Sequence, residues 1–364
     1  MNTSEGIKPS RHGLFDHSDC PDRTAEDPSR ENWRGLAVLL SLLCCLFVLF
    51  WLCHYPVGHT SPTAPSTDNS FSELPDPAEN PAQVTVFRAE NAYALISELK
   101  KNHLWEIKAG SAIAPLLLAS YPTDLETLAV RDKKKAFLNS LLPAALVTNA
   151  EISRERETLL AILDKIPLPT ATLTFSGLRK DWQPYINQEE IGFLKGLARK
   201  YRTKRAEELL KRVNIIPVSL ILAQGALESS WGTSRFTKEG NSLFGLWTWR
   251  GNGIIPLQRE EGKKHRVEAY DSILASLQKY TLTLNRLDAY SDFRSIRTRS
   301  LDPFQLVDGL QLYSERGIEY VNDIKRVISN NGLTEFDEVR FPDTLITMLP
   351  SANSLLTTDK IAQL

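Results

Sequence analysis

Cysteine is scarce, and it is confined to one end of the chain. The four cysteines all precede residue 54, and they are Cys20, Cys44, Cys45 and Cys53. A disulfide framework and a cysteine zinc site are therefore excluded from the rest of the chain. Histidine is almost as rare there, because only His103 and His265 follow residue 60. We therefore expect neither a metal site nor a cofactor.

An excess of charge of either sign is also missing. The chain has 43 Lys and Arg against 44 Asp and Glu, which gives a formal net charge of −1. A general basic surface is excluded, so we expect no nucleic-acid partner. One basic cluster runs from Arg131 to Lys135. We interpret it as a solvated helix face, with binding of an anionic polymer as the lesser alternative.

One long apolar run is present between Gly35 and Cys53. It reads GLAVLLSLLCCLFVLFWLC and contains no charged residue. At ~1.5 Å per residue it would span about 28 Å as a helix, close to the hydrocarbon core of a bilayer. A cleaved signal peptide would have a shorter apolar core and a small-residue cleavage site. With Trp33, Trp51 and Tyr55 as interfacial residues, the pattern predicts a transmembrane signal anchor over residues 35–55.

The basic residues around this run predict its orientation. Arg23, Arg30 and Arg34 precede it, and no Lys or Arg follows until Arg88. The positive-inside rule then places the N-terminus in the cytoplasm and the large C-terminal part outside. Residues 1–34 are polar without an apolar period, which predicts a disordered tail. Residues 56–83 are rich in Pro, Ser, Thr and Asp, which predicts a linker.

From Val84 onward the pattern is that of a globular, mainly α protein. We expect a helical support region over residues 84–180, in which Pro143 kinks or divides a long helical segment. Residues 181–335 form the second predicted domain, which begins with two amphipathic helices. A β-hairpin or ordered loop is expected between Gly251 and Val267. Residues 336–364 are a weakly patterned C-terminal tail.

The most informative stretch is Ile216–Trp249, IPVSLILAQGALESSWGTSRFTKEGNSLFGLWTW. Apolar residues recur near the helical period after Pro217, which predicts a largely buried helix. Glu228 lies at its end, and we expect Gly225 to leave space beside it. Burial disfavours the charged carboxylate, so the pKa of Glu228 should be raised, as a general acid for glycosidic cleavage requires. The alternative is a buried glutamate capped by local donors.

The motif ALESSWG followed by NSLFGLWTW resembles the glucosaminidase superfamily, glycoside hydrolase family 73. More narrowly, it resembles the bacterial Bax-type proteins of that superfamily. The resemblance covers about Glu190 to Leu333, and a weaker match at VRDKKKAFLNSLLPAALVTNAEISRERE extends it back to about Val130. It implies a lysozyme-like α+β catalytic domain with a small β lobe.

The resemblance also implies roles for several residues. Glu228 would be the general acid, and Tyr320 matches the second tyrosine of a late family motif, here YSERGIEYVNDI. Tyr313 is a weaker match, and both tyrosines could instead be core aromatics. A second carboxylate is expected in LQREEGKKHR, at Glu260 or Glu261, although each is also explained as a plain surface charge.

Further residues are candidates for binding substrate. They are Trp231, Asn241, Phe244, Trp247, Trp249 and Tyr313. Sugar stacking and core packing both suit the aromatic ones. We expect Trp231 and Phe244 to be packed and Trp247 and Trp249 to be exposed. Asn241 would either orient its loop or contact an acetamido group.

The resemblance implies an endo-β-N-acetylglucosaminidase that acts on peptidoglycan glycan strands outside the inner membrane of a Gram-negative bacterium. The catalytic domain would be periplasmic and held by the predicted anchor. An inverting route with a bound water and a route assisted by the substrate's N-acetyl group both stay open. A lytic transglycosylase and a non-catalytic glycan-binding scaffold are the alternative functions.

Overall fold

The structure is a computed structural model that describes residues 84–175, 182, 184–249, 251, 253–257, 259 and 262–342. The predicted N-terminal tail, the predicted anchor at 35–55 and the whole of the predicted linker lie outside these residues, as do residues 343–364. Within the described part of the chain, no helix is both long and apolar enough to cross a membrane. The anchor at 35–55 therefore stays a prediction.

The first described residues form a small parallel pair of strands beside a helix. Strand β1 (Thr85–Phe87) pairs in parallel with β2 (Leu116–Leu118), and α2 (Ala92–Lys101) lies between them in the chain. All three leucines of β2 are buried, as expected for a strand covered on both faces. The region predicted to be a purely helical support therefore also contains strands.

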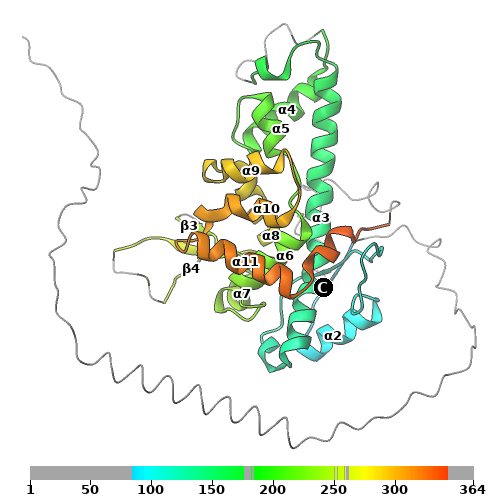
Figure 1. Ribbon diagram of the computed structural model, residues 1–364, viewed down its shortest axis with the longest axis vertical. Helices are drawn as coiled ribbons and strands as arrows, with labels where there is room; N and C mark the ends of the chain where they lie inside the picture. The colour runs from blue at the N-terminus through cyan, green and yellow to red at the C-terminus, as the bar shows by residue number, and fades with distance from the viewer. Residues whose placement is uncertain are drawn as a thin grey trace, which may run out of the picture. The chain divides into compact units, whose positions relative to one another are not determined.

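The longest element is α3 (Val130–Asp164), the long upright helix in Figure 1. Pro143 lies inside it, yet the helix continues through it without interruption. The expectation that Pro143 divides the helix is therefore wrong, and the expectation that it kinks the helix stays a prediction. An interior proline costs about 3 kcal/mol. Here the flanking residues Leu141, Leu142 and Ala144 are all buried, and their packing offsets that cost.

Eight further α-helices follow α3 among the described residues. They are α4 (Gln188–Lys200), α5 (Ala206–Arg212), α6 (Val218–Glu228), α7 (Arg235–Gly240), α8 (Ile273–Arg286), α9 (Ser291–Arg297), α10 (Pro303–Leu306) and α11 (Ile318–Asn330). The two amphipathic helices predicted after residue 181 are α4 and α5, and the predicted buried helix is α6. Since α6 contacts α3, α11 and the turn Leu333–Glu338, it is enclosed by the others.

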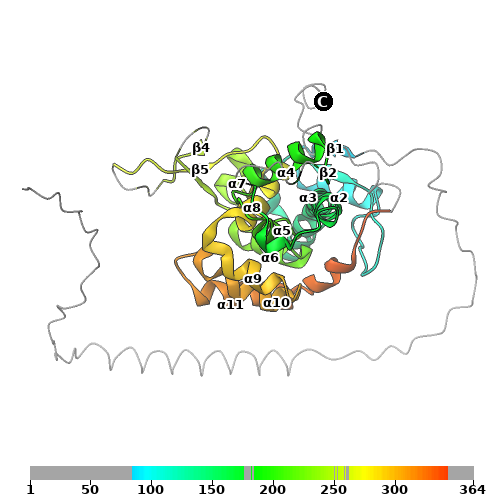
Figure 2. The same ribbon diagram turned by 90° about the horizontal axis from the view of Figure 1, so that it is seen from above.

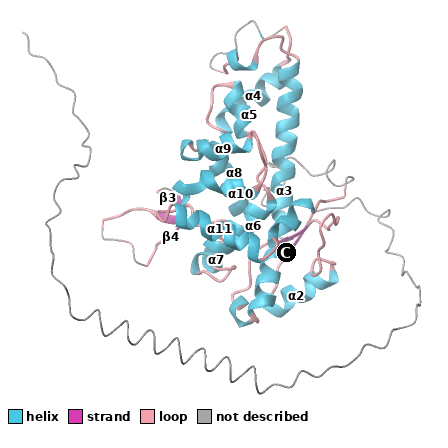
Figure 3. Ribbon diagram, viewed as in Figure 1, coloured by secondary structure: helices cyan, strands magenta, loops and turns pink. Residues whose placement is uncertain are grey.

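The β segment predicted between Gly251 and Val267 is part of a small antiparallel sheet. Its strands are β3 (Trp247–Thr248), β4 (Gly253–Ile254) and β5 (Arg266–Glu268), with β5 in the middle. The sheet lies at one edge of the described part, away from α3 (Figures 1 and 2). Figure 3 shows how little of the fold is strand. The mainly α fold is confirmed, and the lysozyme-like arrangement stays a prediction.

Two hydrophobic cores meet along α3. The larger core joins residues 92–147 with residues 216–341, and it surrounds α6. The smaller core joins Ile152 and the C-terminal half of α3 with α4 and α5. The packing therefore divides within α3, whereas the domain boundary at residue 181 stays a prediction. Because α3 contributes to both cores, it joins the smaller core to the larger one, which contains α6 and Glu228.

Candidate active site

Glu228 is the last residue of α6, as the sequence predicts, and a tight turn follows it. The Ser229 hydroxyl donates to the Gly225 carbonyl at 2.5 Å and accepts from the Gly232 amide at 2.8 Å. Ser230 and Trp231 have left-handed φ values of 53° and 61°. Such backbone is uncommon outside glycine and persists only where the surroundings fix it. The turn therefore holds the carboxyl group of Glu228 at a defined place.

Gly225 does not provide space for Glu228, and that expectation is wrong. A Cβ atom at Gly225 would lie 3.0 Å from Leu141 Cδ2 and 3.6 Å from both Phe137 and Phe244. The missing side chain lets α3 approach α6 closely. Gly225 therefore serves helix packing on the side of α6 that faces α3.

A directed hydrogen-bond chain leads to Glu228 from the core. The Tyr280 hydroxyl on α8 donates to Gln224 Oε1 on α6. Gln224 Nε2 then donates to the Tyr320 hydroxyl on α11 at 2.8 Å. Because the Tyr320 oxygen accepts from Gln224, its own proton is available for Glu228, with which Tyr320 forms a side-chain hydrogen bond. Every donor in the chain therefore points toward the carboxyl group.

The aromatic rings around this chain are stacked. The ring of Tyr313 lies 5.5 Å from that of Tyr320 with an interplanar angle of 7°. The Tyr313 hydroxyl donates to the Phe244 carbonyl at 2.9 Å, and Phe244 stacks on Tyr280 at 3.9 Å. Tyr320 is only 2% exposed. Its ring is thus a core aromatic while its hydroxyl bonds to Glu228, and its catalytic role stays a prediction.

Burial raises the pKa of Glu228 above the ordinary glutamate value. The Tyr320 hydrogen bond and the positive charge of Arg316 oppose this rise, but they are smaller effects. The nearby tyrosines stay protonated, since burial raises the pKa of Tyr290 to about 12 and that of Tyr320 further still. The site therefore holds one carboxyl group that keeps its proton to higher pH than usual, among neutral hydroxyl donors.

The backbone at Gly245 passes beside this carboxyl group. Gly245 has a left-handed φ of 61°, and a Cβ atom there would lie only 3.9 Å from Glu228 Oε2. Any side chain at this position would cover one side of the carboxyl group. The glycine thus leaves Glu228 approachable from the loop that leads into β3.

Two exposed tryptophans lie at the strand that follows, one on β3 and one directly after it. Trp247 and Trp249 are 53% and 68% exposed, as expected. Trp247 stacks on His265 at 4.4 Å and meets Trp249 edge to face at 6.3 Å. We call these three residues the aromatic platform. Flat exposed rings of this kind are suited to stacking on the apolar face of a sugar.

Part of the chain also matches a known protein family. Residues 203–333 match the glucosaminidase family model, described as mannosyl-glycoprotein endo-beta-N-acetylglucosaminidase. The chain is also 29% identical to the protein bax of Escherichia coli strain K12 over 213 residues, which cover 55% of this chain and 70% of that protein. These two matches support the resemblance of the chain to the Bax-type proteins of the glucosaminidase superfamily. No solved structure matches it.

The glucosaminidase domain makes a glycosidase the broad functional class. Phe244 and Trp231 both pack against the larger core, as expected. Trp231 is half-buried, with Lys134 Nζ 4.6 Å from its ring centre. Asn241 caps α7 with a left-handed φ of 51°, and its Nδ2 donates to the Tyr270 carbonyl at 3.1 Å. Of its two expected roles, orienting the loop is the one that these bonds support.

Glu260 and Glu261, the candidates for a second carboxylate, lie outside the described residues. Their roles therefore stay predictions. Among the described residues, no group of three or more His, Cys, Asp or Glu side chains is arranged to hold a metal ion.

Several residues around Glu228 carry little signal in the sequence. No motif marks Tyr280, Tyr290 or Gln224, and Gly245 stands out only as a turn residue. In the sequence, Tyr280 has the spacing of a core residue in an amphipathic helix, which conceals its hydrogen bond. The one available signal was Gln224, because a polar side chain in an otherwise apolar helix needs a buried partner.

Proposed function

We propose that the protein is a peptidoglycan hydrolase that cleaves the β-1,4 bond after N-acetylglucosamine, with Glu228 as general acid. The observation that carries the proposal is the environment of Glu228. Its carboxyl group is half-buried, has a raised pKa and lies beside the open backbone of Gly245. These are the properties of a group that protonates a leaving oxygen near neutral pH.

The chemistry follows from the protonated carboxyl group. Glu228 gives its proton to the glycosidic oxygen while the bond to the anomeric carbon breaks. The carboxylate left behind is then stabilised by the Tyr320 hydroxyl and by the positive charge of Arg316. A proton from water restores the acid in the next cycle. The charge that develops on Glu228 is therefore met by groups already in place, which lowers the barrier.

The oxocarbenium-like sugar needs a second group. We propose Glu260 or Glu261 for an inverting route, in which one of them activates a water molecule. The N-acetyl group of the substrate is the alternative nucleophile. The aromatic platform supports the sugars of a long glycan strand beside the acid.

We also propose that residues 35–55 anchor the protein in the bacterial inner membrane, with the catalytic domain in the periplasm. The predicted linker of residues 56–83 would then carry the domain toward the wall. At ~3.1 Å per residue, an extended linker of this kind reaches about 85 Å.

The test is mass spectrometry of peptidoglycan digested by the full chain in detergent. We expect fragments with N-acetylglucosamine at the reducing end. Anhydro-muramyl ends would instead identify a lytic transglycosylase. Strand binding without any new ends would identify a non-catalytic scaffold, and either result would overturn the proposal.

A further inference from the structure

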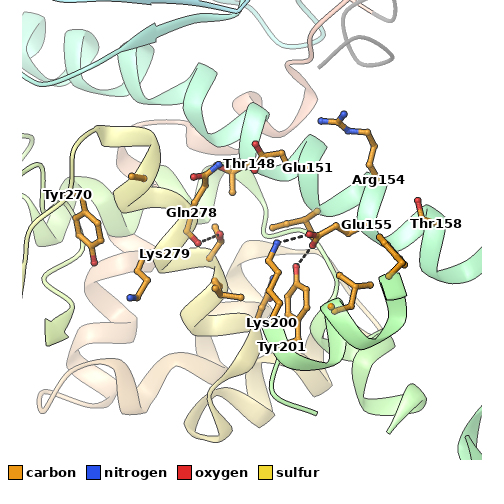
Figure 4. A pocket seen from close by; sticks show the side chains of 18 of the residues that line it. Thr148, Glu151, Arg154, Glu155, Thr158, Lys200, Tyr201, Tyr270, Gln278 and Lys279 are labelled. Atoms are coloured by element: carbon orange, nitrogen blue, oxygen red, sulfur yellow. Dashed lines mark hydrogen bonds and ion pairs between the residues drawn. The ribbon is translucent and has the colours of Figure 1, made fainter. Parts of the chain in front are cut away.

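A hollow lies on the opposite face of α8 from the hydrogen-bond chain. It has a volume of about 830 Å³ and is lined by side chains from α3, α4, β5 and α8. We call it the seam cavity, because it lies where the smaller hydrophobic core meets α8. Figure 4 shows its lining side chains. Its volume falls within the range of about 300–1,000 Å³ that is usual for ligand sites.

Two lysine–carboxylate pairs line the seam cavity. Lys200 contacts Glu155 at 2.6 Å, and the Tyr201 hydroxyl donates to the same carboxylate at 2.6 Å. Lys279 contacts Glu268 at 2.7 Å. In Figure 4, Lys279 lies to one side of Lys200, with Gln278 between them. The cavity thus presents both signs of charge at two separate places.

Glu151 is the buried polar group of this cavity. It is only 9% exposed, and its Oε2 accepts from Gln278 Nε2 at 2.8 Å. Its other oxygen, Oε1, is buried and has no hydrogen-bond partner. Burial raises the pKa of Glu151, which favours the neutral carboxyl form. Because Oε1 lies below the accessible surface, Gln278 is the polar contact that this pair offers to the cavity.

The charges select the class of ligand. A polyanion such as a phosphate ester would be repelled by the carboxylates of Glu155 and Glu268. A neutral sugar can hydrogen-bond to these groups, but it carries no charge that could replace a partner in either ion pair. A molecule with an ammonium and a carboxylate group can exchange into the two ion pairs, which are partly exposed and therefore cost little to open. Its amides can bond to Gln278.

We infer that the seam cavity binds a short peptide that carries both a free ammonium group and free carboxylates. On the proposed function, on which this assignment rests, that peptide is the branch attached to the glycan strand of peptidoglycan. The placement of the cavity agrees with this ligand. The Glu268 amide donates to the Leu246 carbonyl at 2.8 Å, and Leu246 follows Gly245, which passes beside Glu228. One backbone hydrogen bond therefore joins the strand that lines the cavity to the segment that passes beside Glu228.

The probe is the tripeptide L-alanyl-γ-D-glutamyl-L-lysine, titrated calorimetrically into the full chain in detergent. The matched variants are Lys279→Met and Lys325→Met. Both lysines are about one-third exposed, and each contacts a carboxylate at 2.7 Å, but Lys325 pairs with Asp308, which does not line the cavity. We expect Lys279→Met to weaken binding roughly tenfold, the effect of one lost charge-assisted hydrogen bond, and Lys325→Met to leave it unchanged.

Two further measurements make the test specific. Acetylation of both amines of the tripeptide should weaken binding as strongly as Lys279→Met does. Lys279→Met should also raise KM for peptide-bearing strands but leave cleavage of peptide-free strands as in the wild type. The inference is overturned if the tripeptide does not bind, or if the two lysine variants bind it equally. If it binds with the expected differences while no glycan is cut, the inference stands and the proposed enzymatic function fails.

Discussion

Replacing Glu228 by glutamine removes the transferable proton while keeping the size of the side chain. The amide oxygen can still accept the Tyr320 hydroxyl, so we expect the fold to survive. Tyr320 cannot take over as the acid, because burial keeps its pKa far above neutral pH. Turnover should therefore fall by roughly a hundredfold to ten-thousandfold, which is about 3 to 5.5 kcal/mol of transition-state stabilisation.

The assay counts new reducing ends on purified peptidoglycan, with circular dichroism as a check of folding. Asp337→Asn is the matched control. Asp337 is another carboxyl group whose pKa is raised by burial. It accepts hydrogen bonds from Ser219, which lies at the opposite end of α6 from Glu228. We expect that variant to retain wild-type turnover. A folded Glu228→Gln protein that digests peptidoglycan at the wild-type rate would show that Glu228 is not the acid.

The same substitution has a pH-dependent effect on stability. The folded protein holds the Glu228 proton to higher pH than the unfolded chain does. The stability that this proton contributes is complete below the unfolded pKa and is lost as pH rises through the folded pKa. Glutamine does not titrate, so its advantage in unfolding free energy should grow across that window, by about 1.4 kcal/mol for each pH unit between the two values. Denaturant titrations at acidic and neutral pH measure it, and a constant difference would contradict the raised pKa.

The remaining predictions concern the neighbours of Glu228 and the topology. Tyr320→Phe removes a hydrogen bond that lowers the pKa of Glu228, so the alkaline limb of the pH–rate profile should move to higher pH; an unmoved limb would exclude this contact. Trp249→Ala should raise KM for glycan strands with little change in kcat, whereas Leu257→Ala, which shortens an even more exposed side chain in the same lobe, should change neither. Protease added on the periplasmic side should remove everything after about residue 56 and spare the N-terminal tail, and cutting of that tail would reverse the proposed orientation.

The elements that the sequence predicts best have local signals. Ser272 caps α8 by accepting from the Ala275 amide, and Asn187 and Glu190 form a capping box at α4. Glu228 falls at a helix end because turn residues follow it directly. These contacts join residues only three positions apart, so a reading of the chain in order can find them.

The features that sequence reasoning missed depend on distant contacts. Gln224 and Tyr320 lie 96 residues apart, and Gln224 and Tyr280 lie 56 apart. The space beside Gly225 is taken by Leu141 of α3. The strands β1 and β2 pair directly although α2 separates them in the sequence. No local pattern specifies which helix face meets which partner. Tertiary packing decides it, and the same packing carries α3 through Pro143.

The hydrogen bonds from Tyr280 through Gln224 to Tyr320 all donate toward Glu228. Tyr280 donates to Gln224, and Gln224 donates to Tyr320. The Tyr320 proton is therefore directed to Glu228. The hydrogen bond from Tyr320 therefore strengthens as Glu228 loses its proton, because a hydroxyl bonds more strongly to a carboxylate than to a neutral carboxyl group. Burial favours the proton before transfer, and the chain favours its departure during transfer. The two effects act on different states of the same group, so both assist a general acid.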